Sequence, residues 1–142
     1  MQTDNIPRVV VGTLVFKDGK VLLGKRKSNS AIGEYAGPGG YLKFGETLEE
    51  CAERKILEET GVVVEEVKVL SFLNALHWDG LHLLDIEVSA QWVSGDPEVL
   101  NTEMFDSWGW YSLDDLPSPL IVGDEKGLES IVTGERYFGT IQ

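Results

Sequence analysis

The sequence predicts an α/β fold in which helices cover the faces of a mixed β-sheet. Strand-like segments alternate with helical segments along the chain, and no internal repeat or low-complexity linker separates them. The length of 142 residues suits one compact domain with its own core. We therefore expect a single domain over residues 1–142.

The first part of the chain predicts a β-hairpin followed by a loop. The valine-rich run Arg8–Phe16 and the run Lys20–Arg26 each read as a strand, and Asp18-Gly19 between them is a hairpin turn signal. Glycine and proline gather at the end of Lys27–Gly40, which predicts a loop there.

A helix is predicted over Leu48–Thr60 because both of its ends carry cap signals. Thr47 is a suitable N-cap, and Glu50 three residues later completes a capping box. Gly61 supplies a natural stop.

The second half predicts further strands and a closing helix. Two long strand candidates flank a hairpin loop, and a short aromatic strand, a helical turn and a last helix follow. In chain order these are Val62–Ala75, the loop His77–Gly80, Leu81–Val93, Ser107–Tyr111, Leu113–Leu116 and Gly123–Val132.

The net charge of −12, from 12 Lys and Arg against 24 Asp and Glu, constrains the partners. Such a surface repels phosphate backbones, so nucleic-acid polymers and anionic membranes are poor partners, and a small anionic substrate needs a bridging cation. Cys51 is the one cysteine, so no internal disulfide forms. The chain shows no leader and no membrane-spanning apolar run, so a cytoplasmic protein is expected.

On a helical wheel, Lys55 and Glu59 fall within the apolar stripe of the predicted helix, Glu58 borders it, and Arg54 lies just beyond. Two interpretations stay open. The last turn projects past the sheet with Lys55 bridging Glu58 or Glu59, or the carboxylates point into a cleft and share a hard cation such as Mg²⁺. The apolar stripe consists of Leu48, Cys51, Ala52 and Ile56.

The stretch Gly40–Val62 combines spaced glycine, acidic and basic residues, and it resembles the signature of the Nudix hydrolases. Its flanks fit as well: the run Leu22–Arg26, the Gly-Pro-Gly-Gly turn, and Trp108–Tyr111 before a proline. The chain is most similar to small nucleotide-cleaning members of the nucleoside triphosphate diphosphatase type. The spaced residues are Gly40, Glu46, Arg54, Glu58, Glu59 and Gly61.

The resemblance implies an α/β/α sandwich, a Mg²⁺ or Mn²⁺ cofactor and hydrolysis of a diphosphate linkage in a nucleotide. The expected reaction converts a nucleoside triphosphate to a monophosphate and pyrophosphate. By position, the Gly39 carbonyl, Glu58 and Glu59 are the expected metal ligands, with Glu59 the closer one. The resemblance also implies an Arg54–Glu46 ion pair that orients the helix, and structural roles for Gly40 and Gly61.

Lys55 departs from the pattern, because the family has a glutamate at this position. That glutamate is a metal ligand, a general base or both, whereas a protonated lysine cannot bind Mg²⁺. Three explanations stay open: an engineered inactivating change, a natural variant with weakened or redirected activity such as a sugar-nucleotide or other diphosphate hydrolase, or a catalytically dead nucleotide-binding module. Glu103 is the best candidate for a replacement base.

Four residues are candidates for substrate binding. Lys25 and Arg26 form a basic pair that can steady phosphate oxygens, and Tyr35 and Trp78 can stack on a planar group. A solvated strand end and ordinary rim packing are the respective alternatives. The expected partner is a small nucleotide or other organic diphosphate, and a homodimer stays open. Gly37 stands where close relatives have a larger apolar residue, which suggests an enlarged pocket.

Overall fold

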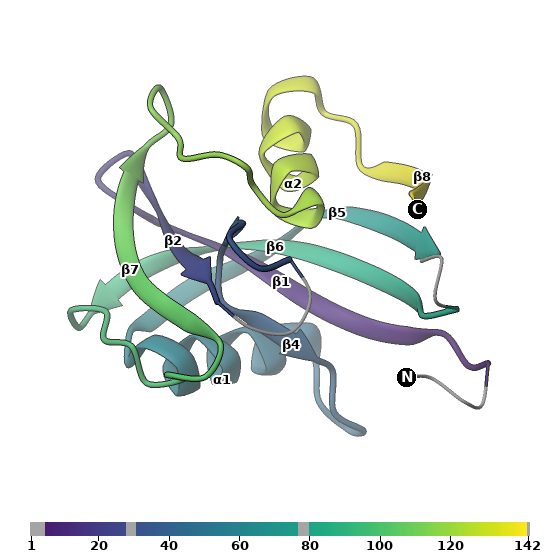
Figure 1. Cartoon of the computed structure of the whole chain (residues 1–142), viewed down its shortest axis with the longest axis horizontal. Helices are drawn as coiled ribbons and strands as arrows, with labels where there is room; N and C mark the ends of the chain where they lie inside the picture. Colours follow the sequence, from purple (N-terminus) through teal and green to yellow (C-terminus); the bar gives the residue numbers. More distant parts are fainter. Residues whose placement is uncertain (1–4, 28–30, 77–79, 142) are drawn as a thin grey trace.

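The computed structural model describes residues 5–27, 31–76 and 80–141, with side chains to residue 139. These residues form eight strands and two helices (Figure 1). In chain order they are β1 (Arg8–Lys17), β2 (Lys20–Arg26), β3 (Tyr35–Ala36), β4 (Gly39–Tyr41), α1 (Leu48–Thr60), β5 (Val63–Leu76), β6 (His82–Ser94), β7 (Phe105–Ser112), α2 (Val122–Thr133) and β8 (Tyr137–Ile141).

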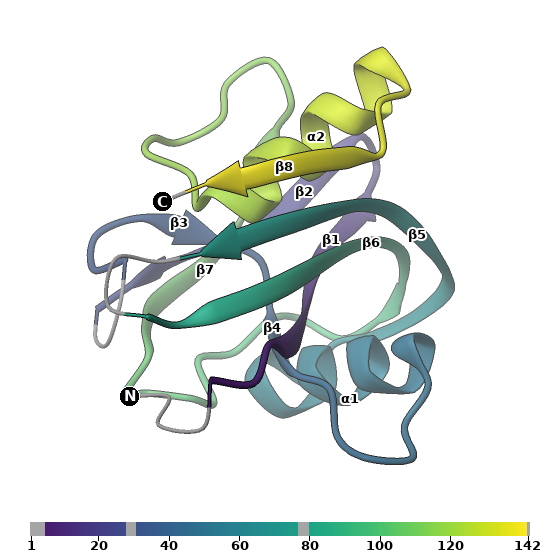
Figure 2. The same ribbon diagram turned by 90° about the vertical axis from the view of Figure 1, so that its right-hand side faces the viewer.

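The strands form one mixed sheet in the order β3-β2-β1-β6-β5-β8, with β4 paired to β1 and β7 paired to β2. Its β1–β6 and β5–β8 pairs are parallel, and its β5–β6 pair is antiparallel. Helix α1 covers one face of the sheet and α2 covers the other (Figures 1 and 2). The predicted α/β/α sandwich is therefore confirmed.

The segment between β2 and α1 occupies a gap in the sheet. The register of β1 and β2 joins them only next to their hairpin, at Phe16 and Lys17 of β1. Farther along, β4 pairs with β1 and β3 pairs with β2. Thr13 donates its N–H (3.0 Å) and its hydroxyl (2.7 Å) to the Pro38 carbonyl. The residues from β3 to β4 are thus fixed against both strands.

The loop prediction for Lys27–Gly40 is wrong in part, because β3 and the start of β4 lie inside it. Strands of two and three residues are too short to show a periodicity in the sequence. The suggested pocket at Gly37 is also wrong, because a Cβ there would collide with the Thr13 carbonyl oxygen. Because Gly37 has no side chain, the backbone of β1 packs directly against it, and no cavity is left at this position.

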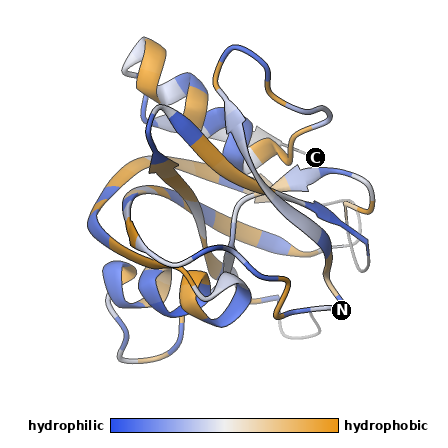
Figure 3. Ribbon diagram, turned by 90° about the vertical axis from the view of Figure 1, so that its left-hand side faces the viewer, coloured by the Kyte–Doolittle hydropathy of each residue, from blue (hydrophilic) through white to orange (hydrophobic). Residues whose placement is uncertain are grey.

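Helix α1 matches its prediction at both ends. The Thr47 hydroxyl accepts from the Glu50 N–H at 3.0 Å, the Glu50 carboxylate accepts from the Thr47 N–H at 2.8 Å, and Gly61 is left-handed at φ 78°. The predicted apolar stripe faces the sheet, where Cys51, Ala52 and Ile56 are fully buried. Figure 3 shows this division, with hydrophilic residues on the outer side of the helix.

The C-terminal part departs from the sequence prediction in two places. Leu113–Leu116 forms a turn and no helix. Strand β8 is absent from the sequence prediction. It pairs in parallel with β5, which is distant in the sequence, so no local pattern indicates this strand. The other strands and α2 are present, with ends shifted by one or two residues. Within the described ranges, no helix is both long and apolar enough to cross a membrane.

Candidate active site

The loop before α1 is tied to the helix by Arg54. Its Nε lies 2.6 Å from Glu46 Oε2, and its Nη2 lies 3.0 Å from Glu46 Oε1. The same guanidinium donates to the Tyr41 carbonyl at 3.2 Å and to Glu58 Oε2 at 3.2 Å. The bond from Arg54, with the N–H of Lys43, lowers the pKa of Glu46 to about 2. Arg54 therefore holds the loop and the helix end together.

Glu59 is a buried carboxylate at the end of α1, only 4% exposed. Its Oε1 accepts a hydrogen bond from the Gly39 N–H at 3.0 Å. Burial raises its pKa, and the Gly39 N–H, Lys55, Asn101 and Arg26 oppose that rise. A carboxylate buried beside a glycine turn is suited to hold a cation or to accept a proton.

Lys55 lies among the acidic side chains of the helix. Its Nζ is 3.3 Å from Glu58 Oε1 and 4.0 Å from Glu59 Oε2. Its stem passes over Gly40, where an added Cβ would come within 2.6 Å of Lys55 Cε. The salt bridges of the first interpretation are therefore present, but the last turn does not project past the sheet, because Glu59 is buried.

Glu58 differs from Glu59 in its exposure. About half of its side chain, 48%, is exposed. Burial raises its pKa, but the hydrogen bonds from Arg54 and Lys55 outweigh that effect, and the net pKa is lowered. Glu58 is thus the ionised, accessible member of the pair, and Glu59 is the enclosed one.

The donor set fits a Mg²⁺ that is shared with a substrate. Mg²⁺ often takes one or two protein carboxylates and completes its shell with water and phosphate oxygens. Glu58 and Glu59 provide two such carboxylates beside the Gly39 backbone. In the part of the chain that the structure describes, no three His, Cys, Asp or Glu side chains converge as ligands, so an all-protein cage is not formed.

The other candidate residues differ in their exposure and in their interactions with Glu59. Arg26 interacts electrostatically with Glu59 and with Asp124 of α2, and its burial lowers its pKa. Lys25 is exposed at the end of β2. Glu103 is exposed in the loop before β7. Their predicted roles stay predictions.

The aromatic candidates stay predictions as well. Tyr35 packs edge-on against Tyr111, with ring centroids 6.0 Å apart, and borders a core cluster. This is the packing alternative of the sequence analysis, and it leaves the substrate role of Tyr35 open. Trp78 lies outside the described residues.

Sequence reasoning missed two residues near this centre. Asn101 hydrogen-bonds the Glu59 carboxylate, and Asp124 Oδ2 accepts from the Gly37 N–H at 2.8 Å. Asn101 stands in an irregular loop, and Asp124 is separated from Gly37 by 87 positions. Asp124 is one of two acidic residues in the first turn of α2, beside Glu125, so no local signal in the sequence distinguishes it.

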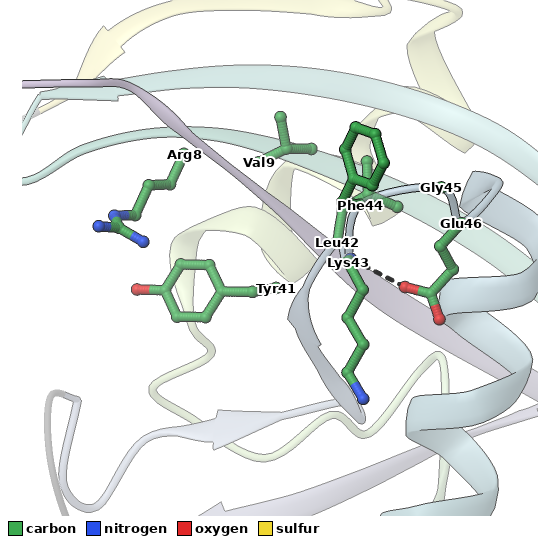
Figure 4. Close-up of a pocket in the computed structure, with 8 residues that line it drawn as sticks. All are labelled: Arg8, Val9, Tyr41, Leu42, Lys43, Phe44, Gly45 and Glu46. Atoms are coloured by element: carbon green, nitrogen blue, oxygen red, sulfur yellow. Dashed lines mark hydrogen bonds between the residues drawn. The ribbon is translucent and has the colours of Figure 1, made fainter.

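An open hollow of about 370 Å³ lies beside the loop that joins β4 to α1 (Figure 4). It shares Glu46 with the Arg54 ion pair but includes neither Glu58 nor Glu59. The chemistry is therefore assigned to the carboxylates at the end of α1, since depth alone does not mark a reactive site. The lining residues are Arg8, Val9, Tyr41, Leu42, Lys43, Phe44, Gly45 and Glu46.

Comparison with known proteins places this fold among the Nudix domains. The chain belongs to the Nudix family: residues 6–131 match the NUDIX domain. A crystal structure of a MutT NUDIX hydrolase from Burkholderia pseudomallei superposes with a TM-score of 0.83 at 33% identity, covering 89% of this chain and 98% of that one. The predicted family is confirmed.

Two curated relatives are named hydrolases of phosphate compounds. The ADP-ribose pyrophosphatase of Methanocaldococcus jannaschii is 49% identical over 57 residues, 40% of this chain. The oxidized purine nucleoside triphosphate hydrolase of Mus musculus is 32% identical over 111 residues, 78% of this chain and 69% of that protein. This chain spans only 34% of the length of the archaeal relative.

Proposed function

We propose that this protein hydrolyses a diphosphate linkage in a small nucleotide with the help of Mg²⁺ or Mn²⁺. The observation that carries the proposal is the buried Glu59 carboxylate, hydrogen-bonded to the Gly39 N–H and set beside Glu58. A bound divalent ion supplies charge neutralisation at the phosphates and lowers the pKa of water.

The residues of the chain have separate roles in this proposal. Glu58, Glu59 and the Gly39 carbonyl hold the ion. Arg54 orients the helix through its ion pair with Glu46. Arg26, which interacts electrostatically with Glu59, binds phosphate oxygens. Glu103 is the proposed base. The formal net charge of −12 favours a small ligand bridged by a cation over a nucleic-acid polymer or a membrane.

The names of the relatives narrow the substrate class. ADP-ribose and oxidized purine nucleoside triphosphates both join a purine nucleoside to a phosphate chain. We propose a nucleoside triphosphate as the substrate, cleaved to a monophosphate and pyrophosphate, with a nucleoside diphosphate sugar as the second choice. A homodimer and a cytoplasmic location stay predictions.

Lys55 is proposed to weaken metal binding. Its ammonium lies 3.3 Å and 4.0 Å from the two carboxylates that would hold the ion. Changing it to glutamate alters the local charge by two units in favour of a cation. The second candidate function, a nucleotide-binding module without turnover, is favoured by this same contact.

The test combines a substrate panel with a matched pair of variants. Nucleoside triphosphates and ADP-ribose are incubated with Mg²⁺ or Mn²⁺, and the products are separated by anion exchange. Lys55→Glu should raise turnover and Mn²⁺ affinity. Lys68→Glu, the same charge change at an exposed residue of β5, should alter neither.

The outcomes separate the two functions. Release of pyrophosphate from a triphosphate, or of AMP from ADP-ribose, by the unaltered chain or by Lys55→Glu alone supports the hydrolase. Stabilisation by nucleotides without turnover in either protein supports the binding module. Absence of both metal binding and turnover in both proteins contradicts the proposed metal site.

A further inference from the structure

Three carboxyl side chains are packed together on the α2 face of the sheet, away from α1. Asp85 and Glu87 come from β6, and Asp124 comes from α2. Glu87 is 2% exposed and Asp124 is 3% exposed. As carboxylates, both Glu87 oxygens and Asp85 Oδ1 are buried and find no hydrogen-bond donor among the described residues. Such groups are costly to bury and need an explanation.

Glycines make the room for these side chains. A Cβ at Gly12 would collide with Glu87 Oε1, and one at Gly127 would collide with Glu87 Cγ. A Cβ at Gly123 would collide with Asp85 Oδ2. Three glycines from β1 and α2 therefore lie directly against the carboxyl groups. Little space is left for a group that could pair with the unsatisfied carboxyl oxygens. A proton fits where a larger ligand does not.

One shared proton satisfies the innermost pair. The carboxyl groups of Glu87 and Asp124 lie close together: a Cβ at Gly12 would collide with Glu87 Oε1 and would lie 3.5 Å from Asp124 Oδ1. Burial raises the pKa of both groups, and that of Glu87 rises further because Asp124 faces it. Asp124 also accepts from the Gly37 N–H and faces Arg26, which favour its charge. Glu87 thus stays protonated, and its O–H donates a hydrogen bond to the Asp124 carboxylate.

Asp124 is connected to the active site through backbone. Its Oδ2 accepts from the Gly37 N–H at 2.8 Å, and two residues later the Gly39 N–H donates to Glu59 Oε1 at 3.0 Å. Helices α1 and α2 lie on opposite faces of the sheet (Figures 1 and 2). Asp124 of α2 therefore accepts from one amide of this turn and Glu59 of α1 accepts from another.

We propose that Asp124, fixed by a hydrogen bond from protonated Glu87, is a positioning residue that sets the Gly37–Gly40 turn against Glu59. The proposal rests on the proposed function, because the turn matters for turnover only if Gly39 and Glu59 form the reactive centre. A catalytic centre is sensitive to such support, since a displacement of about 1 Å can lower the rate about 100-fold.

The shared proton makes this support dependent on pH. When the shared proton leaves, the adjacent carboxylates of Glu87 and Asp124 repel each other, and this repulsion weakens the hydrogen bond from the Gly37 N–H to Asp124. The other ionisable groups that face the pair are Asp85 of β6, which adds to the repulsion, and Arg26 of β2, which opposes it. The turn should therefore loosen as the pH rises and the shared proton is lost.

The test uses one isosteric and one truncating change at the same residue. Asp124→Asn can still accept from the Gly37 N–H. Its amide group does not titrate, and it can donate a hydrogen bond to Glu87. Asp124→Ala removes both bonds. Glu125→Ala, at an exposed neighbouring position of α2, is the matched control. Amide hydrogen exchange at Gly37 and Gly39, kcat and KM are measured between pH 6 and 10.

The expected pattern separates positioning from a general loss of stability. Asp124→Ala should accelerate exchange at both amides and lower kcat about 10- to 100-fold with a smaller change in KM. Asp124→Asn and Glu125→Ala should retain the exchange protection and kcat of the unaltered protein. The unaltered protein should lose protection as the pH rises from 6 to 10, and Asp124→Asn should not.

Two results overturn the proposal: exchange and kcat that are unchanged in a folded Asp124→Ala, or Asp124→Asn that is as impaired as Asp124→Ala. If Asp124→Ala does not fold, the pH comparison of the unaltered protein with Asp124→Asn decides. If no diphosphate is turned over by any protein, the proposed function fails, and the exchange protection at Gly39 still tests the positioning.

Discussion

Lys55 and Glu59 lie one helical turn apart on the buried side of α1, with the Lys55 ammonium 4.0 Å from Glu59 Oε2. Opposite unit charges at this separation attract by about 4 kcal/mol at an effective dielectric constant near 20. The ammonium therefore occupies the electrostatic environment that a bound cation needs, and it stabilises the Glu59 carboxylate in the metal-free protein.

Replacing Lys55 by methionine should raise the pKa of Glu59 further. Burial already raises this pKa, and Lys55 is one of the groups that opposes the rise. Carboxyl carbon shifts followed by NMR across a pH titration measure the effect. Lys68→Met, at an exposed position of β5, is the control. An unchanged Glu59 titration in Lys55→Met would mean that solvent screens the ammonium.

Metal binding should depend on Glu59 and not on Glu53, although both belong to α1. Glu59 is 4% exposed beside Gly39, whereas Glu53 is exposed on the outer side of the helix. Glu59→Gln keeps an oxygen for the Gly39 N–H but removes the charge. It should weaken Mn²⁺ binding at least about tenfold, the equivalent of 1.4 kcal/mol. Equal Mn²⁺ affinities for Glu59→Gln and Glu53→Gln would refute the assignment.

The sequence predicted the parts of the fold that local chemistry determines. Helix α1 has its caps and its apolar stripe within 15 residues, so its limits and its buried face could be read directly. The helical wheel likewise placed Lys55 and Glu59 within the stripe that faces the sheet and Arg54 just beyond it. These features depend on the helical period alone.

Long-range pairing determined what could not be predicted. Strand β8 depends on β5, and β4 depends on β1 for its hydrogen bonds. Asp124 and Glu87 meet only because α2 crosses β6, and neither has a motif around it. Their burial also opposes the usual preference of acidic residues for solvent, so composition gave no hint of them.

Arg54→Lys should lower stability at neutral pH, although it keeps the charge. The guanidinium makes two bonds to Glu46 and one each to the Tyr41 carbonyl and Glu58, a geometry that an ammonium cannot reproduce. The bond to Arg54 is the main reason that the pKa of Glu46 is about 2, so this contribution is present above the ordinary glutamate pKa and is lost as the pH falls towards 2.

Melting temperatures of both proteins between pH 3 and 7 test this expectation. The difference between the unaltered protein and Arg54→Lys should be largest near pH 7 and should narrow with acidification. A difference that is constant over this range would show that Glu46 does not carry the effect.

Asp85 should make the protein less stable as the pH rises from about 4 to about 7. Burial, with a smaller effect of Asp124, raises its pKa to about 7 from 3.8. Between these values the folded state keeps a proton that the unfolded chain has lost, so this stabilisation is full below about pH 4 and declines up to about pH 7. Allowing for partial solvent screening, the decline is on the order of 2 kcal/mol.

Urea unfolding from pH 5 to 9 tests this contribution when Asp85→Asn is compared with the unaltered protein. Glu87 and Asp124 titrate in both proteins, and Asp85 raises the pKa of Glu87, so the difference reports Asp85 together with its coupling to that pair. Asp106→Asn, at an exposed position of β7, should keep the pH dependence of the unaltered protein. An identical pH dependence in Asp85→Asn would rule out the assignment.

Gly127→Ala should destabilise the protein even though alanine favours helices. At an exposed position inside a helix this change stabilises by about 1 kcal/mol. In α2 the new Cβ would collide with Glu87 Cγ and would lie 3.2 Å from Leu14 Cδ1. Overpacking of this kind costs about 1–3 kcal/mol, so the expected sign is reversed.

A double-mutant cycle with Glu87→Ala shows whether Glu87 causes that reversal. Truncation of Glu87 removes the colliding atom, so Gly127→Ala should become neutral or stabilising in the Glu87→Ala background. The coupling between the two changes should exceed about 0.5 kcal/mol, the limit within which independent sites add. Additive free energies of unfolding from urea titrations of the four proteins would instead show that Gly127 is not required by the buried carboxyl.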